Sequence, residues 1–89
     1  MELEKPELHV INGTEYWISG FFFHREDGPA IISLNAKEWY FNGKRHREDG
    51  PAIEYLQNQA TDKWYYHGKN VDCSTQQQFE KIMKLKAFW

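Results

Sequence analysis

Histidine and carboxylate side chains, which often bind metal ions or transfer protons in enzymes, occur together in one octapeptide of this chain. The octapeptide His-Arg-Glu-Asp-Gly-Pro-Ala-Ile spans residues 24–31 and is repeated without change at residues 46–53. An active site built from these residues would suit a metal-dependent hydrolase or nuclease. A catalytic centre, however, brings different residues to one reacting atom, whereas an identical string repeats one local task. The duplication therefore favours a structural role, and we predict a protein that is not an enzyme, with no catalytic residue, metal site or cofactor.

The Asp-Gly-Pro at the centre of each octapeptide is typical of a turn. Aspartate hydrogen-bonds nearby backbone, glycine adopts positive φ, and proline fixes its own φ while extending the residue before it. We expect the arginines to pair with neighbouring acids or with carbonyls of the adjacent repeat, and the histidines to hydrogen-bond the link into place. The predicted structural links contain His24, Arg25, Asp27, Gly28, Pro29, His46, Arg47, Asp49, Gly50 and Pro51.

Segments rich in β-branched and aromatic residues lie on both sides of the links and predict β-hairpins. Asn12-Gly13 is typical of a type I′ turn in the first hairpin, and a tight connection at Asn35-Ala36 predicts the second. Gly43 and Gly68 are expected to end the second and third aromatic strands. The hairpin units are predicted at about residues 8–20, 29–43 and 51–68, lying side by side because no single hairpin buries its own apolar face.

The residues after the last hairpin predict a helix over about residues 75–87. Ser74 and Gln77 have the spacing of a capping box, and Phe79, Ile82 and Met83 fall on one helical face. We expect this helix to pack across one face of the sheet, with Phe88 and Trp89 anchoring its end.

Length and composition limit the fold class to one small domain. The chain has 89 residues, 17% of them aromatic, which is too short for two independent cores. The predicted fold is mainly β with one helix: an antiparallel sheet of about six strands, built from tandem hairpins over residues 1–89 and closed by the C-terminal helix. The triplet Phe21 to Phe23 is expected to be buried on both sides of the sheet.

Charge and cysteine content narrow the class of partner and the compartment. The net charge of −2 and pI near 6.0 argue against a dedicated nucleic-acid binder. Cys73 is the single cysteine, so no intramolecular disulfide can form. No apolar run is long enough for a membrane helix, and the acidic start lacks a signal-peptide pattern. We therefore expect a cytoplasmic protein that does not bind membranes.

The aromatic strands are the predicted partner-binding surface. One helix covers one face of a sheet, so alternate aromatic residues are expected to form an exposed patch for a protein partner or a second copy. Which alternate set points outward stays open. The alternative is binding of single-stranded nucleic acid by stacking on these rings, because bases outnumber acids in residues 39–89. The candidate residues are Trp39, Tyr40, Phe41, Trp64, Tyr65 and Tyr66.

The string His-Arg-Glu-Asp-Gly-Pro-Ala, preceded by Trp-Tyr-Phe-Asn-Gly-Lys, resembles small tandem β-hairpin repeat proteins of bacteriophages and some large viruses. The resemblance covers residues 14–70, and residues 84–89 are similar to the tails of such phage proteins. The aromatic-x-x-Gly rhythm is loosely similar to MORN-type repeats, although the glycine spacing departs from that pattern. The resemblance implies a non-enzymatic interaction module, expressed in the host cytoplasm, that binds and modulates a host protein. It transfers no catalytic residue.

Overall fold

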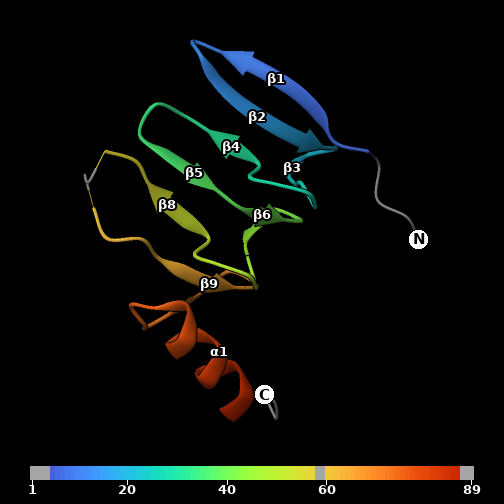
Figure 1. The fold of residues 1–89 in the computed structure, drawn as a ribbon. Helices are drawn as coiled ribbons and strands as arrows, with labels where there is room; N and C mark the ends of the chain where they lie inside the picture. The colour runs from blue at the N-terminus through green and yellow to red at the C-terminus, as the bar shows by residue number, and fades with distance from the viewer. Residues whose placement is uncertain (1–4, 58–59, 87–89) are drawn as a thin grey trace.

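The computed structural model describes residues 5–57 and 60–86, and its largest part is a six-stranded antiparallel sheet (Figure 1). Strand β3 pairs with β2 on the side away from β1, and the other five strands follow one another in chain order. The predicted fold class, mainly β with about six antiparallel strands and a C-terminal helix, is confirmed. The strands of the sheet are β1 (Glu7–Ile11), β2 (Thr14–Ser19), β3 (Phe22–Phe23), β4 (Ile31–Ile32), β5 (Ala36–Glu38) and β8 (Ile53–Tyr55).

Two short hairpins adjoin this sheet. The first joins β6 (Tyr40–Phe41) to β7 (Lys44–Arg45), and the second joins β9 (Trp64–Tyr66) to β10 (Lys69–Val71). Backbone hydrogen bonds of 3.0 Å in both directions between Ile53 and Lys63 connect β8 to the segment that enters β9. The chain therefore forms a row of hairpins from β1 to β10 (Figure 1).

Three two-residue turns with positive φ at both positions define the hairpins. Asn12-Gly13 joins β1 to β2 with φ values of 51° and 82°, as a type I′ turn requires. Asn42-Gly43 (52° and 79°) and His67-Gly68 (46° and 86°) have the same signs. The sequence placed these last two pairs at the ends of strands, and β6 and β9 do end there; it did not predict that the chain reverses at each pair into β7 and β10.

The predicted strand over residues 37–41 is divided at Trp39. The Trp39 N–H donates to the carbonyl of Ala52 (2.8 Å), in the link that leads to β8, while the Trp39 carbonyl accepts from the N–H of His46 (3.1 Å), which follows β7. One residue thus directs β5 into the large sheet and β6 into the small hairpin. The aromatic segment therefore contributes one strand to the large sheet and another to the small hairpin. This division shortens the regular strands to two or three residues.

Helix α1 (Gln76–Leu85) lies beyond β9 at the end of the row, and not across a face of the sheet as expected (Figure 1). Its Phe79 is buried against Trp64 and Val71, with Ile82 and Met83 packed at the margin of the same cluster. The predicted apolar face is therefore confirmed, although it covers the last hairpin only. No helix in the described part of the chain has the length and hydrophobicity needed to cross a bilayer.

The capping box lies one residue later than predicted. Thr75 is the N-cap, and its hydroxyl accepts a hydrogen bond from the Gln78 N–H (3.2 Å). The side-chain oxygen of Gln78 accepts from the N–H of Ser74 (2.8 Å). Two Ser/Thr-x-x-Gln patterns overlap in the sequence, and the Thr75 pattern forms. Residues 87–89, including the predicted anchors Phe88 and Trp89, lie outside the described residues.

The phenylalanine triplet is not buried as predicted. Phe21 lies at the tip of the two-residue turn between β2 and β3 and is 100% exposed, and Phe22 is also exposed. Only Phe23 turns inward, where it stacks on Tyr16 with 5.8 Å between ring centroids. The expectation assumed an extended segment, whereas the chain reverses at Gly20-Phe21.

Replacing Phe79 with alanine should lower the free energy of unfolding by about 3–5 kcal/mol, because it removes the ring that fills the contact between α1 and the last hairpin. Phe79 is 1% exposed, whereas Leu85 on the same helix is 76% exposed. Leu85→Ala is therefore the matched control and should change stability by about 0.5 kcal/mol or less. Urea denaturation followed by tryptophan fluorescence measures both, and equal losses would contradict this account of the helix.

Candidate functional site: the repeated links and the surface at the first hairpins

Each octapeptide folds around its own arginine. In the first copy, the guanidinium of Arg25 lies 4.3 Å from the ring centroid of Trp17. Its Nε donates to the carboxylate of Asp27 (3.0 Å), and its Nη1 donates to the carbonyl of Pro29 (3.1 Å). The Arg25 side chain is thus held by one cation–π contact and two charge-assisted hydrogen bonds.

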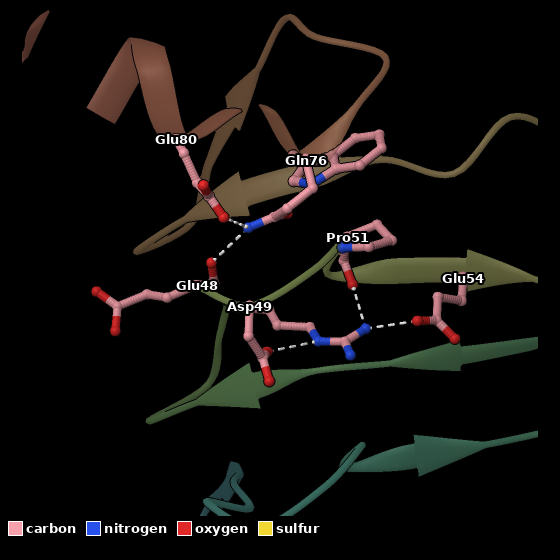
Figure 2. A network of polar contacts seen from close by, with 8 residues as sticks. Glu48, Asp49, Pro51, Glu54, Gln76 and Glu80 are labelled. Carbon is pink, nitrogen blue, oxygen red and sulfur yellow. Dashed lines mark hydrogen bonds and ion pairs between the residues drawn. The ribbon is translucent and has the colours of Figure 1, made fainter. Parts of the chain in front are cut away.

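The second copy repeats this arrangement. The Arg47 guanidinium lies 3.8 Å from the ring centroid of Trp39 and donates to Asp49 (2.9 Å) and to the Pro51 carbonyl (3.1 Å). It also pairs with Glu54 of β8, and Figure 2 shows the three acceptors around it. The sequence predicted neighbouring acids or carbonyls of the adjacent repeat as partners. The neighbouring aspartates are partners in both copies, whereas the shared carbonyl lies in the same link and not in the adjacent repeat, because the turn folds each link back onto its own arginine.

The glycine of each octapeptide is required for space and not for positive φ. An ideal Cβ on Gly28 would lie 3.0 Å from the Arg25 Cζ, and one on Gly50 would lie 2.7 Å from the Arg47 Cζ. Neither glycine has positive φ, so the conformational reason predicted from the sequence was wrong. Each guanidinium therefore contacts both a tryptophan ring and a glycine backbone, an approach that a Cβ would obstruct.

The histidines tie each link to the following turn. The Nδ1 of His24 accepts a hydrogen bond from the backbone N–H of Asn42 (3.0 Å), and the Nδ1 of His46 accepts one from His67 (2.9 Å). Both donors are residues with positive φ at the first position of a hairpin turn. An accepting Nδ1 carries no proton, so the proton of the neutral ring must be on Nε2. The histidines thus hold the link in place, and the partner in both copies is the next hairpin.

The same histidines form a row of ring contacts along the hairpins. His24 lies edge-on to Phe41 at 4.7 Å between centroids, Phe41 lies 6.4 Å from His46, and His46 lies 4.9 Å from Tyr66. Val71 ends β10 at the position where His46 follows β7, and it is buried in the cluster under α1. The row therefore runs from the first link to the edge of the helix-covered core.

His46 is the histidine with the clearest electrostatic perturbation. Partial burial lowers the pKa of His46 below its usual value of about 6.5, and the nearby ring of His67, 4.1 Å away between centroids, lowers it further. The carboxylate of Glu48 opposes this by raising the pKa. The net direction agrees with the hydrogen bond, which only the neutral ring can accept.

The pKa values of Tyr40 and Cys73 are also shifted. Burial, followed by the charge of Glu38, raises the pKa of Tyr40. Burial, aided by Asp72, raises the pKa of the Cys73 thiol, which makes the thiolate scarcer and the residue less nucleophilic. Neither residue is thereby poised for reaction.

The aromatic residues predicted to bind a partner contact their neighbours in the fold. Trp64 is buried, and the other five are half-buried: Trp39, Tyr40, Phe41, Tyr65 and Tyr66. Trp39 lies under a guanidinium, as described above, while Arg45 lies between Tyr40 (5.7 Å) and Tyr65 (5.4 Å). None of the six presents a free ring face comparable to that of Phe21. Their part in binding stays a prediction.

An open cleft of about 760 Å³ lies between the two links and β6. Tyr40 and Phe41 form part of its wall, and the carboxylates of both octapeptides line it together with Arg25 and Arg47. Arg25 and Arg47 pair with Asp27 and Asp49, so the carboxylates of Glu26 and Glu48 leave an excess of acid at this cleft. It suits a basic or polar segment better than a phosphate group.

Gln76 at the start of α1 connects the helix to the second link, a contact that the sequence did not signal. Its side-chain oxygen accepts from the Trp64 Nε1 (2.8 Å), and its Nε2 donates to the Glu48 carbonyl (2.9 Å) and the Glu80 carboxylate (3.1 Å). Figure 2 shows Gln76 reaching from the helix toward the backbone of the link. The helix therefore covers the last tryptophan, as the arginine links cover the other two, although the helix does so through a glutamine hydrogen bond and not through a guanidinium.

Large exposed apolar side chains gather at the opposite end of the row. Five of the seven in the described residues lie on the first two hairpins, namely Leu8, Val10, Ile11, Phe21 and Phe22. The register places Leu8 opposite Trp17 and Phe22 opposite Ser19, so Leu8, Val10 and Phe22 share one face of the sheet. We call Leu8, Val10 and Phe22, with Phe21 at the turn tip, the N-terminal apolar surface. Its only signal in the sequence was the phenylalanine triplet.

Comparisons with protein-family models, with curated proteins and with solved structures found no match to this chain. Within residues 5–57 and 60–86, no group of three or more His, Cys, Asp and Glu side chains is arranged to hold a metal ion. The contacts and exposures above are therefore the basis for a proposal of function.

Gly50→Ala should destabilise the protein by about 1–3 kcal/mol, because the added methyl displaces the Arg47 guanidinium from Trp39 and Asp49. The steric cost should largely disappear in an Arg47→Ala background, where no guanidinium is present. Urea denaturation of the wild type, both single variants and the double variant gives the coupling energy. Additive losses would contradict the proposed contact.

The stability contributed by His46 should be lost in acid. Because the pKa of His46 is lowered in the folded state, the unfolded chain binds the proton more readily. The contribution is complete above the unfolded value near 6.5 and falls as the pH drops from there through the folded pKa. His46→Asn keeps an acceptor near the position of Nδ1 but does not titrate. Unfolding free energies above pH 7 and near pH 5 should therefore differ more for the wild type than for this variant; an equal difference would contradict the assignment.

Proposed function

We propose that this protein is a non-catalytic protein-binding module whose partner docks on the N-terminal apolar surface. The observation that carries the proposal is Phe21, fully exposed on a two-residue turn, with Phe22, Leu8 and Val10 exposed nearby in the first two hairpins. Contiguous exposed apolar side chains commonly mark interaction sites in soluble proteins. A ring on a tight turn also loses little conformational freedom on binding, which suits an anchor residue.

The interior of the row supports this location of the binding surface. The arginines, histidines and aromatic strands of the links are occupied by contacts with one another, so they hold the hairpins in position. The predicted candidates Trp39, Tyr40 and Phe41 line the acidic cleft between the links, where they would contribute only if the partner extends a basic segment beyond the apolar surface.

The resemblance of the octapeptides to phage and viral hairpin repeats supports a further part of the proposal. The chain would be a viral accessory protein that binds and modulates a host protein in the host cytoplasm. A small, non-catalytic module with one apolar docking surface is suited to inhibiting or redirecting such a partner by occupying its surface.

Binding of single-stranded nucleic acid gains no support from the geometry. Stacking on bases requires free ring faces, but Trp17 and Trp39 lie under guanidinium groups and Trp64 is buried. The cleft beside the aromatic strand is lined with carboxylates that would repel phosphate.

Phe21→Ser should reduce capture of the partner by roughly tenfold or more, as loss of a central aromatic anchor does. The measurement is affinity capture from host lysate with quantitative mass spectrometry, using tagged wild type and variant. Phe21 is fully exposed, so the variant should keep the wild-type melting temperature.

The matched control is Leu34→Ser, which removes a different exposed apolar side chain (79% exposed) at the turn between β4 and β5. It should capture as much partner as the wild type does. Equal capture by Phe21→Ser and the wild type, or equal loss in both variants, would count against the N-terminal apolar surface as the docking site.

A further inference from the structure

Strand β1 is the last strand at one side of the large sheet, and all five of its residues are exposed. It pairs only with β2 within the described residues. Ile11 and Thr14 flank the two-residue turn and form the first pair, so in such a hairpin they exchange both backbone hydrogen bonds. Because the pattern alternates, the N–H and C=O groups of Leu8 and Val10 must point away from β2, toward the open side of the sheet.

This open side lacks most of the features that normally prevent edge pairing. Protein edges are commonly protected by short strands, bulges, lysine or proline. Strand β1 pairs in five consecutive positions without a bulge and contains no lysine, while Pro6 lies just before it. At the other end of the row, α1 covers the last hairpin. The edge of β1 is therefore a template for one more antiparallel strand.

We propose that β1 pairs with β1 of a second copy of this chain, so that two sheets join into one across a two-fold axis. The inference rests on the proposed function only in that both involve the first hairpins. The edge groups are backbone atoms, whereas the N-terminal apolar surface is a face of the sheet. An antiparallel junction has its two-fold axis perpendicular to the sheet, so the apolar surfaces of both copies lie on the same side and remain open to another protein.

Charge complementarity selects the second copy as the occupant and sets the register. With Leu8 opposite the same residue of the second copy, Glu7 faces His9 across the junction, and the symmetry repeats this pair. Glu7 and His9 already lie 3.8 Å apart within the strand, so each Glu7 carboxylate would have one imidazole beside it in its own strand and a second across the junction. The alternative register, with Leu8 opposite Val10, places the two His9 rings against each other and Glu7 opposite Ile11.

The backbone groups fit the same register. The outward N–H and C=O of Leu8 would bond to those of Leu8 in the second copy. The N–H of Val10 would donate to the carbonyl of Pro6, a residue that has no N–H and so can only accept at this position. The junction therefore uses the outward groups of β1 without disturbing its ladder with β2.

Sedimentation equilibrium of the full chain over a range of concentrations tests the junction. The wild type should show the mass of two chains at high concentration and dissociate on dilution. Val10→Pro removes an outward N–H that β2 does not use, so it should weaken dimerisation tenfold or more while circular dichroism and the melting temperature keep the hairpin signal. Ile11→Ser removes an exposed apolar side chain whose backbone faces β2, and it should leave the dimer intact.

The register is tested by reversing charges. Glu7→Lys should weaken the dimer, and adding His9→Glu to that variant should restore it. A wild type that stays monomeric at every concentration, or a dimer unaffected by Val10→Pro, would overturn the junction. Loss of partner capture by Phe21→Ser in a monomeric protein would leave the proposed function standing while this inference fails, and a β1 dimer without capture would show the reverse.

Discussion

The structure depends on one repeated hydrogen bond, from the backbone N–H of the first residue of a hairpin turn to the Nδ1 of a histidine in the preceding link. Asn42 donates to His24, and His67 donates to His46. The strands that these bonds join are only two or three residues long, too short to be stable as isolated pairs. Each bond fixes the distance between a link and the following hairpin, and the hairpin in turn orients the next histidine. Cooperativity along the row replaces the large continuous core that a thin molecule of 39 × 38 × 17 Å cannot form.

The arginine of each octapeptide explains why the whole string recurs, and not the histidine alone. The histidine can accept its bond only if the link leaves the hairpin in one direction, and the contacts of Arg47 with Trp39, Asp49 and Gly50 impose that direction. The aspartate, glycine and proline of the string each contact the guanidinium or leave the space that it occupies. The recurrence of arginine, aspartate, glycine, proline and histidine is thus accounted for by packing and hydrogen bonding inside the fold.

The features that the sequence predicted correctly are local ones. The turn at Asn12-Gly13 and the apolar face of α1 follow from backbone preference and helical periodicity, which act over a few residues. The errors arose where specific side-chain or backbone contacts, and not local preference alone, decide the outcome, or where two local patterns competed. The glycine at position 50 responds to Arg47, the strand breaks at Trp39 because of Ala52 and His46, and the choice of Thr75 over Ser74 as cap came from two overlapping patterns of equal merit. The exposure of Phe21 depends on a reversal of the chain between β2 and β3, and no Asn-Gly pair in the sequence indicated a turn there.

The two ends of the row differ, and this difference supports the proposed location of the binding surface. At the C-terminal end, a helix takes the place of a third link. Gln76 accepts a hydrogen bond from the indole N–H of the last tryptophan, and Phe79 packs against that ring and helps to bury it. At the N-terminal end, β1 follows the same antiparallel rule but nothing in the described residues covers its outer edge or the ring of Phe21. The repeats between the two ends use most of their arginine, histidine and tryptophan side chains in contacts with one another. Among the described residues, the uncovered end therefore offers an apolar surface on which binding would cost no internal contact.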